Sequence, residues 1–178
     1  MAVKEITLPL FGKVKLEQTD WEYQYLGSLS EYEFGELLVD IDVNFQQIND
    51  TNIKKVSQVL NDLEKISQLG SDFLAQDFEA EGETKRYINE WDQDIFDQIF
   101  TAEELEVFIQ NTDNSKSKQE RFLSLLRLVR VGVYAEGDDD FLVLDYAFGR
   151  DYDKGFRDDM LVLYMDKDYK VCEVSTEG

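Results

Sequence analysis

Alternating hydrophobic and polar positions dominate the last third of the chain. Apolar side chains occupy the odd positions of residues 128–136 and the even positions of residues 141–148, with a glycine among aspartates between the two stretches. Such alternation is typical of strands joined by a hairpin turn. Similar patterns over residues 160–165 and 170–174 predict two more strands. We therefore expect a four-stranded antiparallel meander over about 128–174, which the earlier part of the chain must cover.

The first third of the chain also alternates, in shorter stretches. Residues 3–8 and 13–16 predict two strands on either side of a turn at the only proline, Pro9. A short alternation of aromatic residues follows, and residues 37–45 then give the clearest strand pattern of this third. We expect strands over about 3–45, with the polar face of the last strand in contact with solvent.

In the middle of the chain, the apolar spacing changes to three and four residues, as in helices. Asp50 is a candidate N-cap and Gly70 a candidate C-terminal stop for the first helix. A string with the form of a capping box runs from Thr101 to Glu104 and predicts another helix start. These patterns predict helices over about 51–127.

The order of strands, helices and strands predicts the fold class. No low-complexity linker or internal repeat divides the 178 residues. We expect a single α+β domain over residues 1–178, with a largely antiparallel sheet built from the N-terminal and C-terminal strands and the helical middle packed on one face.

The charge and composition exclude several classes of function. The chain has 39 acidic and 18 basic residues, for a net charge of −21, and it has no histidine. The lack of histidine removes Ser-His and Cys-His nucleophilic pairs and imidazole zinc sites. No glycine-rich phosphate-binding string occurs, and a strongly acidic surface opposes direct binding of nucleic acid. We therefore expect a protein that is not an enzyme and that needs no cofactor.

The cysteine content and the apolar runs bear on the expected compartment. Cys172 is the only cysteine, so the chain cannot form an internal disulfide, and its place in an alternating strand predicts a buried structural thiol. No signal-peptide pattern and no run of about 18 apolar residues is present. We expect a cytoplasmic protein that does not bind membranes.

Four short strings carry a resemblance to a known group of proteins. They are LPLFG at 8–12, VRVGVY at 129–134, DYAFG at 145–149 and EVSTE at 173–177. In this order they resemble a family of small bacterial proteins of uncharacterised function, a "domain of unknown function" group, over nearly the whole chain. The resemblance implies one compact domain and a bacterial source, with no catalytic residues to carry over. Small acidic α+β proteins also look like the immunity proteins that neutralise bacterial toxins, by analogy of size and charge.

Carboxylates on the predicted strands suggest one kind of chemistry. Asp40 and Asp42 lie on the same side of one strand, and Asp145 stands among apolar residues in another, so the three could converge on Mg²⁺ or Ca²⁺. A carboxylate-metal-dependent hydrolase is therefore an alternative function, although a solvated strand face explains the same pattern more simply. The acidic stretch 151–159 does not fit an EF-hand loop, because Gly155 falls at the wrong position.

The acidic middle of the chain suggests binding. Residues 71–111 hold twelve acids, two bases and several aromatic residues, most of which the helical spacing assigns to the core. We hypothesise that Glu90, Asp94 and Asp97, near Trp91, steer a basic protein or peptide onto this segment. The sequence thus favours a non-enzymatic acidic protein-binding module, with an inhibitor or immunity-like protein among the candidates. An acidic structural or stability protein without a cationic partner is the other alternative, and the oligomeric state stays open.

Overall fold

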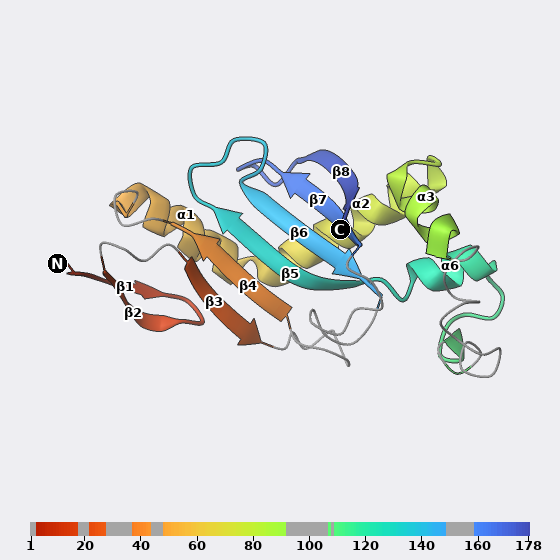
Figure 1. Cartoon of the computed structure of the whole chain (residues 1–178), viewed down its shortest axis with the longest axis horizontal. Coiled ribbons are helices and arrows are strands. Elements are labelled where there is room, and N and C mark those ends of the chain that lie inside the picture. Colours follow the sequence, from red (N-terminus) through yellow and green to blue (C-terminus); the bar gives the residue numbers. More distant parts are fainter. Residues whose placement is uncertain are drawn as a thin grey trace.

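The computed structural model combines strands and helices in the order that the sequence predicts (Figure 1). It describes residues 3–17, 22–27, 37–43, 48–91, 107, 109–148 and 159–178. The strands of these residues are β1 (Val3–Leu8), β2 (Gly12–Glu17), β3 (Glu22–Gly27), β4 (Leu37–Asp42), β5 (Arg127–Tyr134), β6 (Leu142–Ala147), β7 (Met160–Met165) and β8 (Val171–Glu177). Their helices are α1 (Asp50–Asn61), α2 (Leu63–Glu79), α3 (Glu83–Glu90) and α6 (Lys118–Leu123).

The main sheet has six strands in the order β3-β4-β5-β6-β7-β8. Neighbouring strands are antiparallel except β4 and β5, which run parallel. The predicted α+β class and largely antiparallel sheet are confirmed. The N-terminal strands β3 and β4 join the C-terminal strands as expected, but β1 and β2 pair with each other in a separate two-stranded sheet. The expectation of one sheet is therefore wrong for this first hairpin.

The C-terminal meander is confirmed, with two differences from the sequence pattern. The last strand, β8, continues to Glu177, because the full length of β7 pairs with it, up to Met160 opposite Glu177. In β5 the register shifts between Leu128 and Arg130. Leu128 therefore belongs to the hydrophobic core with the odd-numbered residues that follow it, whereas Val129, which the alternation assigns to the core face, is buried outside that core cluster.

Helices α1 and α2 lie behind the sheet in the view of Figure 1 and cover one of its faces. Leu142, Leu144 and Tyr146 of β6 point to this side and belong to the main core. Ile66 and Leu74 of α2 belong to the same core. Helices α3 and α6 lie beyond one end of the sheet. We call the opposite side of the sheet, away from α1 and α2, the second face.

The ends of the first helices differ from the sequence expectation. The N-cap of α1 is Asn49 rather than Asp50, because the Asn49 side chain accepts two backbone N–H groups of the first turn. The helical run breaks at Asp62 and then continues through Gly70, which is therefore no C-terminal stop. Gly70 is buried, and a Cβ atom built there would overlap the hydroxyl oxygen of Tyr146. A glycine is needed here for close packing of α2 on β6.

A capping box occurs at a different position from the predicted one. Thr101 lies outside the described residues. At the start of α6, the Ser117 hydroxyl accepts the backbone N–H of Glu120, and the Glu120 carboxylate accepts the backbone N–H of Ser117. This helix ends at Leu123, a few residues earlier than the sequence pattern suggests, and the chain turns directly into β5.

Candidate functional site

The second face of the sheet is buried at its centre. Along β6, Val143, Asp145 and Ala147 point to this face, and each is exposed by less than a tenth of its surface. Leu38 of β4 and Val162 of β7 are also buried. The expectation that the polar face of residues 37–45 meets solvent holds at Asp42, which is exposed, but not at Leu38, which is buried, and Asp40 is half-buried.

One arginine joins two carboxylates in this buried region. The Nε–H of Arg130 donates to Oδ2 of Asp40, and an Nη1–H donates to Oδ2 of Asp145 at 3.0 Å. The three side chains are 17%, 18% and 5% exposed, respectively. Arg130 pairs with Leu38 of β4 on one side and with Asp145 of β6 on the other. The parallel pairing of β4 with β5 therefore brings both carboxylates to the same guanidinium.

A glycine makes room for this arginine. Residues 130, 132 and 134 alternate along β5, so their side chains share one face. A Cβ atom built on Gly132 would lie 3.0 Å from a ring carbon of Tyr134 and 3.2 Å from Nη2 of Arg130. The guanidinium uses this space to donate from Nη2 to the Tyr134 hydroxyl at 3.2 Å. Gly132 is thus the point of close approach between the side chains of Arg130 and Tyr134.

The protonation of the cluster follows from burial and pairing. Burial raises the pKa of the Asp145 carboxyl, and the neighbouring Arg130 guanidinium offsets part of this rise. Burial acts to lower the pKa of Arg130, but the hydrogen bonds with Asp40, Tyr134 and Asp145 outweigh it and raise the pKa above its ordinary value. Arg130 therefore stays cationic, while Asp145 is a weaker acid than an exposed aspartate.

The structure places two of the three predicted metal ligands on one guanidinium. Asp40 and Asp145 come together, as the sequence suggested, but the cation between them is the Arg130 guanidinium. Asp42 lies exposed farther along β4. Within the described ranges, no group of three acidic, cysteine or histidine side chains could hold a metal ion. The carboxylates of Asp40 and Asp145 are therefore better placed to pair with an arginine than to bind a divalent cation.

The predicted partner-binding residues are only partly described. Trp91 is 2% exposed, and its ring packs against Phe148 at 5.1 Å and Tyr87 at 6.1 Å between ring centres. Trp91 is thus a core residue and cannot anchor a partner in this state. Glu90 is exposed at the end of α3, whereas Asp94 and Asp97 lie outside the described residues.

The cysteine is exposed rather than buried. Cys172 lies near the start of β8, and its side chain faces solvent because β8 is an edge strand and the residue points away from the core. Desolvation by the surrounding chain and the carboxylates of Asp139 and Asp166 raise the pKa of the thiol. Cys172 is therefore protonated near neutral pH and is a poor nucleophile.

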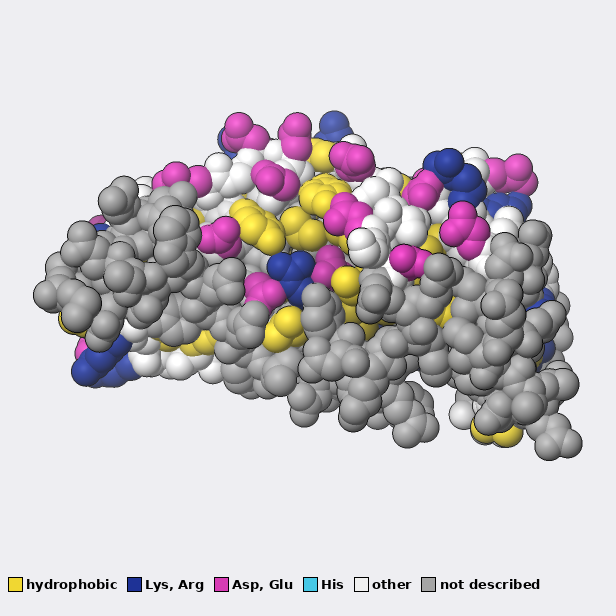
Figure 2. Space-filling model, viewed as in Figure 1, with side chains coloured by type: hydrophobic (Ala, Val, Ile, Leu, Met, Phe, Trp, Pro, Cys, Tyr) yellow, Lys and Arg dark blue, Asp and Glu magenta, His cyan; other side chains and the backbone are white. Residues whose placement is uncertain are grey.

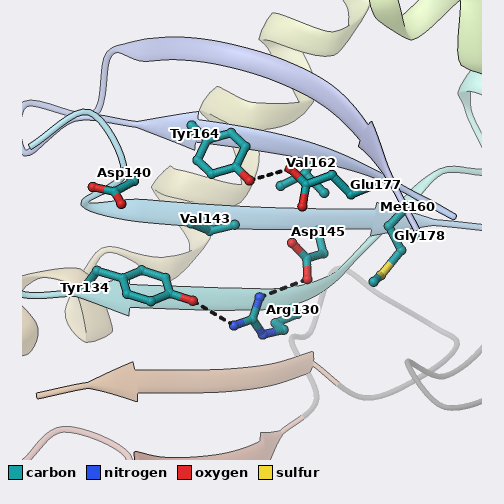
Figure 3. Close-up of a pocket in the computed structure, with 10 residues that line it drawn as sticks. All are labelled: Arg130, Tyr134, Asp140, Val143, Asp145, Met160, Val162, Tyr164, Glu177 and Gly178. Atoms are coloured by element: carbon teal, nitrogen blue, oxygen red, sulfur yellow. Dashed lines mark hydrogen bonds and ion pairs between the residues drawn. The ribbon is translucent and has the colours of Figure 1, made fainter. Parts of the chain in front are cut away.

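A pocket of about 450 Å³ opens on the second face above β5 to β8 (Figure 3). Tyr134 of β5 and Tyr164 of β7 stand on its two sides, and Val143 lies between them on β6. The lining residues are Arg130, Tyr134, Asp140, Val143, Asp145, Met160, Val162, Tyr164, Glu177 and Gly178. Figure 2 shows the same face, with a cationic side chain at its centre, acidic side chains beside it and hydrophobic ones above.

One wall of the pocket is held by a hydrogen bond between neighbouring strands. The Tyr164 hydroxyl of β7 donates to Oε1 of Glu177 on β8, and this bond is the main reason that the pKa of Tyr164 is raised. The Ser175 hydroxyl donates to the same carboxylate oxygen at 2.9 Å. Glu177 is therefore fixed at the pocket edge by one oxygen, and its Oε2 stays available.

Sequence reasoning missed Arg130, Tyr134 and the pocket. Two signals were present: an aspartate within an apolar strand needs a buried partner, and a glycine within a strand marks close approach of other atoms. In the string Arg130-Val-Gly132-Val-Tyr134 the arginine, the glycine and the tyrosine share one face of the strand. The partner strand of Asp145 depends on sheet order, which no local pattern gives.

Comparisons with known proteins return no matching family model, no curated relative and no similar solved structure. The resemblance of the four short strings to a family of uncharacterised bacterial proteins thus stays a prediction. In the part of the chain that the structure describes, no helix has the length and apolar character needed to cross a membrane. The fold and the pocket are therefore the basis for any functional argument.

Proposed function

We propose that the protein is a non-enzymatic binding module that receives a basic protein or peptide on the second face of its sheet. The observation that carries this proposal is the charge of the pocket. Its lining contains three carboxylates, those of Asp140, Asp145 and Glu177, against the single guanidinium of Arg130.

The pairing of Arg130 favours a cationic ligand over an anionic one. Its guanidinium already donates to two carboxylates and one phenol, so an incoming anion gains little from it and meets the remaining carboxylates. The net charge of −21 adds a long-range field that attracts cations. A cationic partner is therefore drawn toward this surface and finds acceptors there.

The apolar part of the pocket favours a partner with side chains over a bare ion. Val143, Val162 and Met160 contribute hydrocarbon surface, and the two tyrosines contribute rings. Interfaces combine such apolar anchors with charged groups that guide the approach. The pocket thus supports binding of a basic polypeptide better than the carboxylate-metal-dependent hydrolase suggested by the sequence.

The test is a calorimetric titration of the protein with a basic peptide of mixed lysine and arginine content and with an acidic peptide of equal length. We expect only the basic peptide to bind, and we expect its affinity to fall as salt is added, because exposed charges are screened over about 10 Å at 0.1 M. Failure of the basic peptide to bind at low salt would contradict the proposed function.

Two sets of variants separate the pocket from the acidic helical segment. Asp140→Asn/Glu177→Gln should weaken binding more than Asp138→Asn/Glu173→Gln, a matched pair from the same loop and the same strand that does not line the pocket. The charge reversal Glu90→Lys/Asp94→Lys/Asp97→Lys tests the surface that the sequence suggested. If this reversal abolishes binding and the pocket pair has no effect, the partner binds the helical segment instead.

A further inference from the structure

Asp145 carries an oxygen that is placed for a ligand. Its side chain is only 5% exposed, and Arg130 is its only hydrogen-bond partner among the described residues. That bond uses Oδ2, while the other oxygen, Oδ1, points along the pocket floor toward Val143 and Tyr164 (Figure 3). Oδ1 borders the pocket and is not fully enclosed by the protein, so a hydrogen-bond donor that enters the pocket can reach this atom.

The other carboxylates also offer single oxygens. Oε1 of Glu177 accepts from Tyr164 and Ser175, which leaves Oε2 for a ligand. Asp140 lies at the opposite end of the pocket from Glu177 (Figure 3). Guanidinium groups prefer to pair with both oxygens of one carboxylate, whereas an ammonium group donates in three directions to separate acceptors. Single oxygens from different strands therefore suit an ammonium group better.

The two tyrosines can contact the same cation. Neighbouring strands are separated by about 4.7–4.9 Å, so β5 and β7, on either side of β6, are about 10 Å apart. Tyr164 pairs directly with Val143, and Tyr134 stands farther along β5. The space above Val143 is thus flanked by two rings whose faces attract cations. Val162 and Met160 add apolar surface for an alkyl chain.

We infer that the pocket binds the side-chain ammonium group of a lysine on the basic partner. This inference rests on the proposed function and names the residue by which the partner is anchored. The ammonium group donates to Oδ1 of Asp145 and Oε2 of Glu177, and the alkyl chain packs between Tyr134 and Tyr164. A free small amine has the same chemistry but lacks the partner's contacts outside the pocket.

The experiment uses a peptide of neutral residues with one central lysine, because a single charge limits nonspecific attraction to the acidic protein. Its affinity is measured by NMR titration and compared with that of two peptides in which arginine or Nε-acetyl-lysine replaces the lysine. We expect the acetylated peptide to bind at least about tenfold more weakly, since it lacks the charge, and the arginine peptide to bind several-fold more weakly. The shifted resonances should include those of Val143 and Tyr164.

Variants locate the contact. Asp145→Asn should lower the affinity for the lysine peptide by about tenfold or more. Because Asp145 is buried, its replacement can also disturb folding, and a second variant is needed. Glu177→Gln changes an exposed residue of the edge strand and keeps an oxygen for the Tyr164 hydroxyl, so it tests the same contact in a folded protein. Glu173→Gln, on the same strand and outside the pocket, is the matched control and should leave the affinity unchanged.

The outcomes separate this inference from the proposed function. If the mixed basic peptide binds but the lysine and arginine peptides bind equally, or Glu177→Gln has no effect, the binding function stands and the lysine site is wrong. If no basic peptide binds, both are wrong. If cadaverine, a free diamine, binds as tightly as the lysine peptide, the pocket is a small-amine site, and the inference that it binds a lysine of a partner is wrong.

Discussion

The two faces of β6 bury their side chains in different ways. On the face covered by helices, Leu142, Leu144 and Tyr146 pack against apolar side chains of α1 and α2. On the second face, the neighbouring Asp145 is equally buried but lies against Arg130. The first face excludes water by hydrocarbon packing, and the second keeps charged groups in place by pairing them.

This difference indicates different roles for the two faces. Hydrocarbon packing contributes to stability in proportion to the area removed from water. A buried ion pair contributes less, because desolvation of the charges offsets most of their attraction. The cluster of Asp40, Arg130 and Asp145 is therefore explained better by the position it gives to Tyr134 and to the free oxygen of Asp145 than by net stabilisation. The predictions below test this contrast.

The largest effect is expected from Arg130→Leu, which leaves Asp40 and Asp145 without their cation. We expect a loss of about 3–5 kcal/mol in the free energy of unfolding, measured by urea titration at neutral pH. Replacing all three residues by leucine should restore most of this loss, since no buried charge remains. If Arg130→Leu alone is as stable as the original protein, Asp40 and Asp145 do not need the guanidinium to stay buried.

On the helix-covered face, Leu144→Ala should cost about 2–5 kcal/mol, because it leaves a cavity against α2. The matched substitution on the second face is Val143→Ala, one residue away on the same strand. It should cost less, since Val143 borders an existing pocket. Equal losses for the two variants would mean that the second face is packed as tightly as the first.

A smaller effect is expected where α2 crosses β6. Replacing glycine by alanine within a helix normally stabilises it by about 1 kcal/mol. At Gly70 the new methyl group would meet the Tyr146 hydroxyl, so we expect Gly70→Ala to destabilise by about 1–3 kcal/mol. In a Tyr146→Phe background the loss should shrink, because the overlapping oxygen is absent. A denaturant titration of the four proteins in this cycle measures the coupling directly.

The smallest effect concerns pH and the raised pKa of Asp145. The folded protein takes up this proton at a higher pH than the unfolded chain does, so stability decreases as the pH rises through the raised pKa. The original protein should therefore gain stability relative to Asp145→Asn as the pH falls from about 7 toward about 4. A difference that stays constant over this range would mean that the carboxyl titrates normally.

Much of the fold could be predicted because the signals are local. The alternation in Met160–Met165 gave the bounds of β7 correctly, since period-two patterns depend only on which residues of a strand face the core. The separate hairpin of β1 and β2 could not be predicted in the same way. Its residues alternate like those of any strand, and nothing within them encodes which neighbour they pair with.

The candidate site was harder to predict, because it depends on pairing between distant strands. The sequence marked Asp40 and Asp145 as unusual, and the structure brings them together. It did not identify Arg130 as the group between them, since the parallel pairing of β4 with β5 decides that contact. Trp91 shows the opposite case, because its helical spacing already indicated the core position in which it lies.

The parallel pairing of β4 with β5 also has a consequence for the order of folding. The hairpins of β5 to β8 join segments that are close in the chain, whereas Asp40 and Arg130 are 90 residues apart. Closing so long a loop costs chain entropy before any contact compensates for it, and topologies with distant contacts fold slowly. We therefore expect the meander to form early and β4 to dock late. In this order of events, Arg130 gains its second carboxylate, that of Asp40, only when β4 docks.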